Sequence, residues 1–98
     1  MTISKTQNAS TLTLALEGRL DTTTAPELEK ALNDSLPDAT ALILDFAGLE
    51  YISSAGLRVL LCAHKAMSSK GGMKVLRVNE IVNEVFEVTG FADILTIE

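Results

Sequence analysis

Residues 42–63 read LILDFAGLEYISSAGLRVLLCA, and this stretch decides the fold. The segment 41–45 is apolar up to its final aspartate, which suits a strand that is covered on both sides or placed in the middle of a sheet. After a short turn come Ser53 and Ser54, and apolar residues at helical spacing follow them at once. We therefore expect a strand over 41–45 and a helix over about 54–69.

The two serines stand where this helix begins. The first N–H groups of a helix have no intrahelical partner, and the peptide dipoles make that end slightly positive. A hydroxyl there is a natural cap, and an anion there is stabilised. Ala55 and Gly56 keep the first turn small, although a glycine inside a helix costs about 0.5 to 1 kcal/mol relative to alanine. We expect that another molecule approaches the backbone closely here.

The sequence around the serines resembles a known family signature. The run DFAGLEYISSAGLRVLL, residues 45–61, is similar to that of the anti-sigma factor antagonists, which are single-domain members of the STAS fold. The resemblance extends to GRLDTTTAPELEKAL at 18–32 and to VNEIVNEVFEVTGFADIL at 78–95, so it covers nearly the whole chain. In that family a serine at the helix start is phosphorylated by a partner kinase. The match of the following Gly-Leu places this serine at Ser54, whereas many relatives carry aspartate at the position of Ser53.

The resemblance implies a function. Unmodified family members bind an anti-sigma factor that is itself an ATP-using serine kinase, and they thereby free the sigma factor. Phosphorylation, here expected at Ser54, breaks that complex, and a metal-dependent serine phosphatase resets the protein. The chain would then be a binder and a kinase substrate, neither an enzyme nor the holder of a cofactor, because ATP and magnesium belong to the kinase. The alternative is a non-switching STAS subunit of a transport or stress-signalling complex, in which the serine pair is only a cap.

A partner-binding surface can be predicted around the helix start. The loop after Gly18 and the first turn of the helix rest on family matches, and Asp21 matches an acidic position that lies near the phosphorylated serine. A solvated turn aspartate is the other interpretation of Asp21. Three further residues are expected to point outward because the apolar band of the helix is wider than packing on one sheet face requires. The predicted partner-binding residues are Asp21, Thr22, Ser53, Ser54, Ala55, Gly56, Arg58, Val59 and Cys62.

Composition excludes several other classes of function. The 98 residues include 13 acidic and 8 basic ones, a net charge of -5, and no cluster of Lys or Arg, which argues against nucleic acid as a partner. No signal peptide and no apolar segment of about 20 residues appears, so we expect a cytoplasmic protein without membrane insertion. Cys62 is the single cysteine, expected to be buried, and neither it nor the single histidine, His64, has neighbours at metal-ligand spacing.

The rest of the chain completes an α/β fold. Alternating leucines predict a strand over 11–17, which the Asn-Ala-Ser turn joins to a weaker strand over 2–7 as an antiparallel hairpin. Thr24 and Glu27 fit a capping box that opens the first helix. Later segments predict a strand over 73–78, a third helix capped by Asn79 and ended by Gly90, and a last strand over 94–97.

Together these elements predict a STAS fold. We expect a mixed sheet of about five strands with an antiparallel edge hairpin, a parallel remainder and helices packed mainly on one face. Residues 1–98 are expected to form a single STAS domain.

Overall fold

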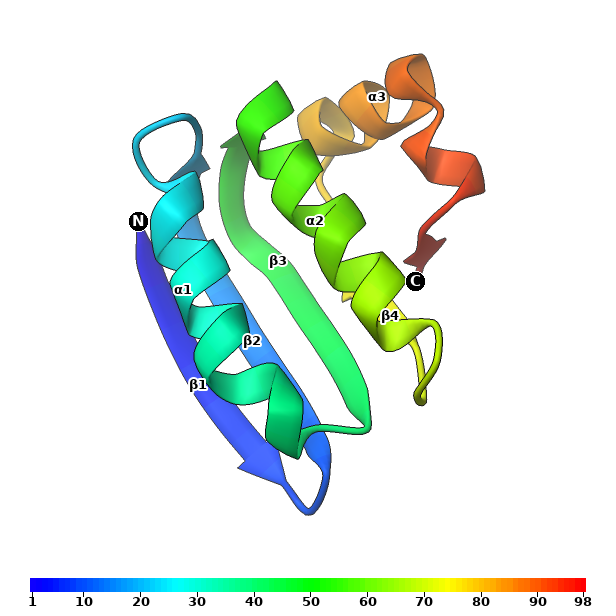
Figure 1. The fold of residues 1–98 in the computed structure, drawn as a ribbon. Helices are drawn as coiled ribbons and strands as arrows, with labels where there is room; N and C mark the ends of the chain where they lie inside the picture. The colour runs from blue at the N-terminus through cyan, green and yellow to red at the C-terminus, as the bar shows by residue number, and fades with distance from the viewer.

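The computed structural model describes residues 1–98 and contains one sheet and three α-helices (Figure 1). The strands are β1 (Thr2–Asn8), β2 (Thr11–Leu20), β3 (Ala41–Ile52), β4 (Met73–Leu76) and β5 (Thr96–Ile97). The α-helices are α1 (Ala25–Ser35), α2 (Ser54–Met67) and α3 (Glu80–Thr89), and short 3-10 helices span Leu36–Asp38 and Phe91–Asp93. None of the three α-helices combines the length and the apolarity that crossing a bilayer requires.

The sheet has the predicted mixed topology. Its strand order is β1-β2-β3-β4-β5, with β1 antiparallel to β2 and every later neighbour pair parallel. The helices that connect the parallel strands lie over one face, where α1 and α2 run side by side (Figure 1). The predicted antiparallel edge hairpin, parallel remainder and one-sided helical layer are therefore confirmed.

The core lies between this helical layer and the sheet. Side chains that alternate along the two central strands are essentially fully buried under the helices, whereas the residues between them are only half-buried. The buried residues of these strands include Leu12, Leu14, Leu16, Leu42, Leu44 and Phe46. Phe46 meets Phe86 of α3, with ring centroids 6.4 Å apart, so α3 joins the same core. The apolar run that begins β3 therefore reflects a central strand, and only one of its faces is covered by helices.

The third strand is much longer than the sequence predicted. It continues through the expected turn to Ile52, because β2 also continues to Leu20 and the two strands stay paired. Register shifts between Ala15 and Glu17 and between Gly18 and Arg19 accommodate this irregular stretch. A residue pattern that resembled a turn is thus a bulged continuation of the strand.

The predicted start and end signals hold for α3, whereas the cap predicted for α1 does not. Asn79 caps α3 by accepting a hydrogen bond from the Val82 N–H at 2.8 Å, and Gly90 ends that helix with a φ of 84°. The capping box predicted for Thr24 and Glu27 is wrong, because Thr24 makes no side-chain cap bond. Its hydroxyl instead donates to the Arg19 carbonyl at 2.8 Å, which ties the start of α1 back to the end of β2.

Candidate functional site

The candidate site lies where the neighbouring strands β2 and β3 both reach their carboxyl ends. Leu20 and Ile52 are register partners, and the Ser53 N–H donates to the Leu20 carbonyl at 2.9 Å. After β2 the chain continues as the loop that begins at Asp21, and after β3 it continues into α2, which begins at Ser54. The two segments predicted to form one surface are therefore adjacent in space.

The two serines occupy different environments. Ser54 is the first residue of α2 and is exposed. Ser53 is the N-cap residue with φ −101° and ψ 176°, and its side chain makes no cap hydrogen bond. The Ser53 hydroxyl oxygen is buried and has no hydrogen-bond partner. The prediction that a serine hydroxyl caps this helix is wrong, and only Ser54 presents its side chain at the surface.

Free backbone donors surround Ser54. The Leu57 N–H donates to the Ser53 carbonyl at 2.9 Å and is the first backbone bond of the helix. The amides of Ser54, Ala55 and Gly56 precede that bond, so they have no intrahelical acceptor. With the positive end of the helix dipole, they favour a negative group at this position.

Gly56 has a different role from the predicted one. It is buried, and a Cβ at this position would lie 2.7 Å from Leu20 Cγ and 2.9 Å from Ile52 Cγ1. The close approach that glycine permits is therefore internal, between the first turn of α2 and the ends of β2 and β3. The prediction that glycine leaves room for another molecule is wrong.

Asp21 organises its own loop. Its Oδ1 accepts hydrogen bonds from the Thr23 hydroxyl at 2.7 Å, the Thr23 N–H at 3.0 Å and the Thr24 N–H at 3.2 Å. The hydrogen bond from the Thr23 hydroxyl is the main reason that the pKa of Asp21 is lowered, and the two amides add to it. The carboxylate is thus an ionised turn group that fixes the approach to α1, and it is half-buried rather than fully solvated.

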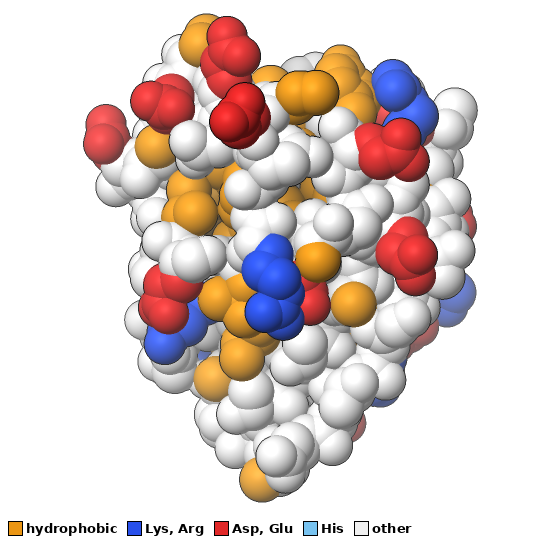
Figure 2. All heavy atoms as spheres, turned by 180° about the vertical axis from the view of Figure 1, so that it is seen from behind, with side chains coloured by type: hydrophobic (Ala, Val, Ile, Leu, Met, Phe, Trp, Pro, Cys, Tyr) orange, Lys and Arg blue, Asp and Glu red, His pale blue; other side chains and the backbone are white.

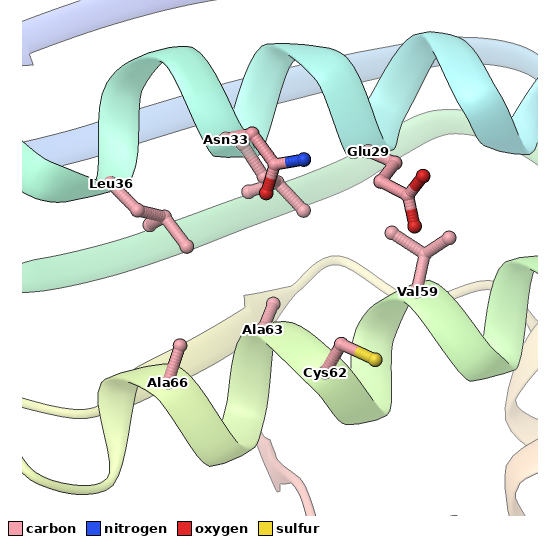
Figure 3. Close-up of a pocket in the computed structure, with 8 residues that line it drawn as sticks. Glu29, Asn33, Leu36, Val59, Cys62, Ala63 and Ala66 are labelled. Atoms are coloured by element: carbon pink, nitrogen blue, oxygen red, sulfur yellow. The ribbon is translucent and has the colours of Figure 1, made fainter.

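A groove runs from this loop along the space between α1 and α2. Its end near the loop has a volume of about 230 Å³. The lining there consists of Thr22, Ala25, Pro26, Glu29, Ala55, Arg58, Val59 and Cys62. A smaller hollow of about 90 Å³ continues it and shares Glu29, Val59 and Cys62 (Figure 3). The structure therefore places five of the predicted partner-binding residues on one groove.

The exposures of two groove residues differ from those predicted. Val59 was expected to point outward, but it is only 7% exposed because it packs in the interface between α1 and α2. For Cys62 the expectation of a buried small side chain is wrong, and the expectation that it points outward on the docking surface holds, because it is exposed at the groove. Arg58 is exposed, as predicted.

The side of the groove that α1 forms was not predicted. Glu29 and Asn33 of α1, and Leu36 directly after it, lie opposite Val59 and Ala63 of α2 (Figure 3). The helical spacing of Leu32 and Leu36 could have indicated this side, because both fall on the face that α1 turns to the core. The polar residues Glu29 and Asn33 carry no sequence signal for it.

A cation–π pair beside the site was also missed. The Arg19 guanidinium lies 4.5 Å from the centre of the Tyr51 ring, and the two residues are register partners on β2 and β3. Arg19 Nε is 3.9 Å from Asp21 Oδ2, so the pair reaches the loop. The register that joins these residues depends on two bulges, which the sequence does not reveal.

No group of three or more His, Cys, Asp or Glu side chains is arranged to hold a metal ion.

Comparison with known proteins identifies the family. The family model described as the STAS domain matches residues 2–98. BtrV of Bordetella bronchiseptica, provisionally named an anti-sigma factor antagonist, is 36% identical over 88% of this chain and 76% of its own length.

Solved structures agree on the fold. An anti-sigma factor antagonist from Mycobacterium paratuberculosis is similar with a TM-score of 0.89 and 23% identity, covering 98% of this chain and 83% of its own. The Bacillus cell fate determinant SpoIIAA in its phosphorylated form has a TM-score of 0.76 and 17% identity, with 99% of this chain and 91% of that chain covered.

Anti-sigma factor antagonists are regulatory binding proteins rather than enzymes. The chain therefore belongs to the STAS domain family and, within it, to the anti-sigma factor antagonists.

Proposed function

We propose that this protein binds an anti-sigma factor with serine kinase activity and so releases a sigma factor, and that phosphorylation of Ser54 breaks the complex. In this proposal residues 1–98 act as one domain in the cytoplasm. The kinase and a metal-dependent serine phosphatase are separate proteins that supply the phosphoryl chemistry.

The observation that carries the proposal is the contrast between the two serines. A kinase must reach the oxygen that it modifies, and Ser54 is exposed at the start of α2 whereas the Ser53 oxygen is buried. Neither hydroxyl caps the helix, so a purely structural role for the pair has no support from hydrogen bonding. That absence of a capping role favours the switch over the fixed STAS subunit.

A phosphoryl group on Ser54 suits the local structure. It adds about 1.5 to 2 negative charges and three acceptor oxygens next to the free amides of the first turn. Arg58, four residues further along α2, is exposed on the same side of the helix and can approach the phosphate. The fold should therefore tolerate the modification.

The same phosphoryl group would disfavour a partner bound over Ser54. The site continues into the groove that Ala55, Arg58 and Cys62 line, so a protein seated on the groove would cover Ser54. A phosphate enclosed there brings bulk and a desolvated charge. A penalty of about 3 kcal/mol would weaken binding about 100-fold.

The test uses Ser54→Ala and Ser54→Asp as paired baits in lysate from the source cells, with mass spectrometry of the captured proteins. Ser53→Ala is the matched control, because it removes the neighbouring hydroxyl and leaves Ser54 in place. We expect Ser54→Ala and Ser53→Ala to retain a serine kinase that Ser54→Asp loses. Retention of the same non-kinase proteins by all three variants would instead identify a fixed subunit.

The native thiol gives a second measurement on the purified complex. Cys62 is the only cysteine and is exposed in the groove, so a maleimide reagent reports on its coverage. We expect the captured kinase to slow modification of Cys62 in the wild-type chain and to leave it fast in Ser54→Asp. If the kinase binds the wild-type chain and Cys62 is still modified as fast as in the free protein, the partner sits elsewhere.

A further inference from the structure

The net charge of the chain comes entirely from its last segment. All 8 basic residues lie within residues 1–77, which also hold eight of the 13 acidic residues and are therefore neutral overall. Residues 80–98 contain the other five acidic residues and no basic one, which accounts for the formal charge of -5. The charge is thus concentrated on α3 and the segment that follows it.

The acidic side chains of α3 are not neutralised within the chain. None of the four ion pairs involves an α3 residue, and Glu98 is the only acid of 80–98 that has a basic partner, Lys74, at 3.3 Å. Glu80 and Glu84 are one helical turn apart, and Glu87 lies in the last turn, where the helix dipole disfavours negative charge. Glu80 is favoured at the helix start and Glu87 accepts a hydrogen bond from Asn83 Nδ2 at 3.0 Å, but no basic side chain pairs with any of the three.

The outer face of α3 is also apolar. Ile81 is 59% exposed and Val88 is 81% exposed, although α3 buries Val82 and Phe86 in the core. Ile81, Glu84, Val85 and Val88 follow the spacing i, i+3, i+4 and i+7, so they form one stripe along the helix. With Thr89 they line a shallow hollow of about 290 Å³.

Acidic and apolar side chains are interspersed on this surface. Seen from behind, acidic side chains gather at the upper left of the molecule with apolar ones between them, on the side where the turned view brings α3 (Figure 2). No Lys or Arg side chain stands within that group (Figure 2). We refer to the exposed stripe together with Glu80 and Glu87 as the α3 face.

We propose that the α3 face binds a basic amphipathic helix of another protein. An apolar stripe at helical spacing is the arrangement by which one helix packs against another, and the glutamates would pair with Lys or Arg at the rim. A second copy of the α3 face would add repulsion, and anionic lipid or nucleic acid would be repelled as well. This interaction does not involve Ser54, so it stands apart from the proposed switch.

The first test uses a synthetic amphipathic helix built only from leucine and lysine, and the same pattern built from leucine and glutamate as the control peptide. Chemical-shift changes of the isotopically labelled chain should follow α3 with the lysine peptide and stay absent with the glutamate peptide. The double variant Glu84→Lys/Glu87→Lys should lower the affinity at least about tenfold. Glu27→Lys/Asp34→Lys on α1 changes the net charge equally and should leave the affinity within about twofold.

Two results of this titration would overturn the proposal. In one, the shift changes map away from α3. In the other, both double variants weaken binding equally, which would mean that net charge alone attracts the peptide.

The second test identifies the natural partner. A photo-crosslinking residue at Val88 in the source cells should capture a protein through a segment that is basic and amphipathic. The same residue at Lys30, which is exposed on α1, should not capture that segment. Crosslinking at Val88 to a second copy of this chain, to a neutral or acidic segment, or to no protein at all would contradict the proposal.

Discussion

Replacing Ser53 by alanine tests how the start of α2 is built. Replacing a serine that caps a helix by alanine normally lowers the stability of the protein by about 0.5 to 2 kcal/mol. Here the hydroxyl oxygen is buried without a partner, and an unsatisfied buried polar group costs about 1 to 3 kcal/mol. Ser53→Ala removes this cost, but it also removes the packing contacts that the oxygen makes, which offsets part of the gain in stability. We therefore expect Ser53→Ala to range from neutral to about 1 kcal/mol more stable than wild type.

The assay is urea unfolding followed by circular dichroism, with the slope of the free energy against urea checked for constancy. Asn79→Ala is the matched control, because Asn79 is a helix cap that works. Its Oδ1 accepts from the Val82 N–H at 2.8 Å and its Nδ2 donates to the Leu49 carbonyl at 2.8 Å. That variant should lose about 1 to 2 kcal/mol. If Ser53→Ala loses as much as Asn79→Ala, the Ser53 hydroxyl has a partner and the reasoning is refuted.

Two further changes probe the packing and the charge pairs of the fold. Gly56→Ala forces a Cβ to within 3 Å of atoms of Leu20 and Ile52, which are 0% and 1% exposed, so thermal unfolding should show a loss of about 1 to 2 kcal/mol. Leu20→Ala opens that space, and a Gly56→Ala loss that persists undiminished in the Leu20→Ala background would contradict the steric explanation. The Arg77 guanidinium forms hydrogen bonds of 3.0 and 3.1 Å to Asp45, and this contact lowers the pKa of Asp45. Ionised Asp45 therefore stabilises the fold above its unfolded pKa of about 3.9, and this stabilisation is lost as the pH falls through the lower folded value. Wild type should exceed Asp45→Asn in stability at pH 7, and the gap should narrow below about pH 4 in unfolding curves; a gap independent of pH would rule out the ion pair as its cause.

Local signals predicted much of the architecture. The alternation of Leu12, Leu14 and Leu16 has period two, so it identifies a strand with one buried face. Asn79 and Gly90 bound α3 as expected, because a cap and a left-handed glycine act through their own neighbouring atoms. Local cap signals did not hold everywhere, because the Thr24 hydroxyl donates to the Arg19 carbonyl instead and the Ser53 hydroxyl has no partner.

The misses share a non-local cause. Residues 46–52 resemble a turn, and they form a strand only because β2 extends alongside and pairs with them across two bulges. The burial of Val59 likewise depends on α1, which the apolar band of α2 cannot specify. Helical spacing identifies a band of side chains, but the neighbouring helix decides which edge of that band is covered.

The position of the candidate site could be predicted from the sequence, but the roles of several of its residues could not. The loop at Asp21 and the serine pair do lie next to each other, at the carboxyl ends of β2 and β3. The roles of Ser53 and Gly56 could not be predicted from the sequence. The burial of the Ser53 oxygen and the internal contact of Gly56 depend on side chains from two strands. Distances between segments are needed to separate the exposed serine from the enclosed one.

The tight seating of Gly56 also bears on kinetics. The first turn of α2 lies against fully buried side chains of two strands, so this segment has little freedom to swing open or closed. A phosphoryl group on Ser54 would then alter the chemistry of a fixed surface, with no slow rearrangement between the two states. On the proposed function, a partner is accepted or rejected at the moment of encounter. The time to respond would be set by diffusion and by the departure of the partner already bound.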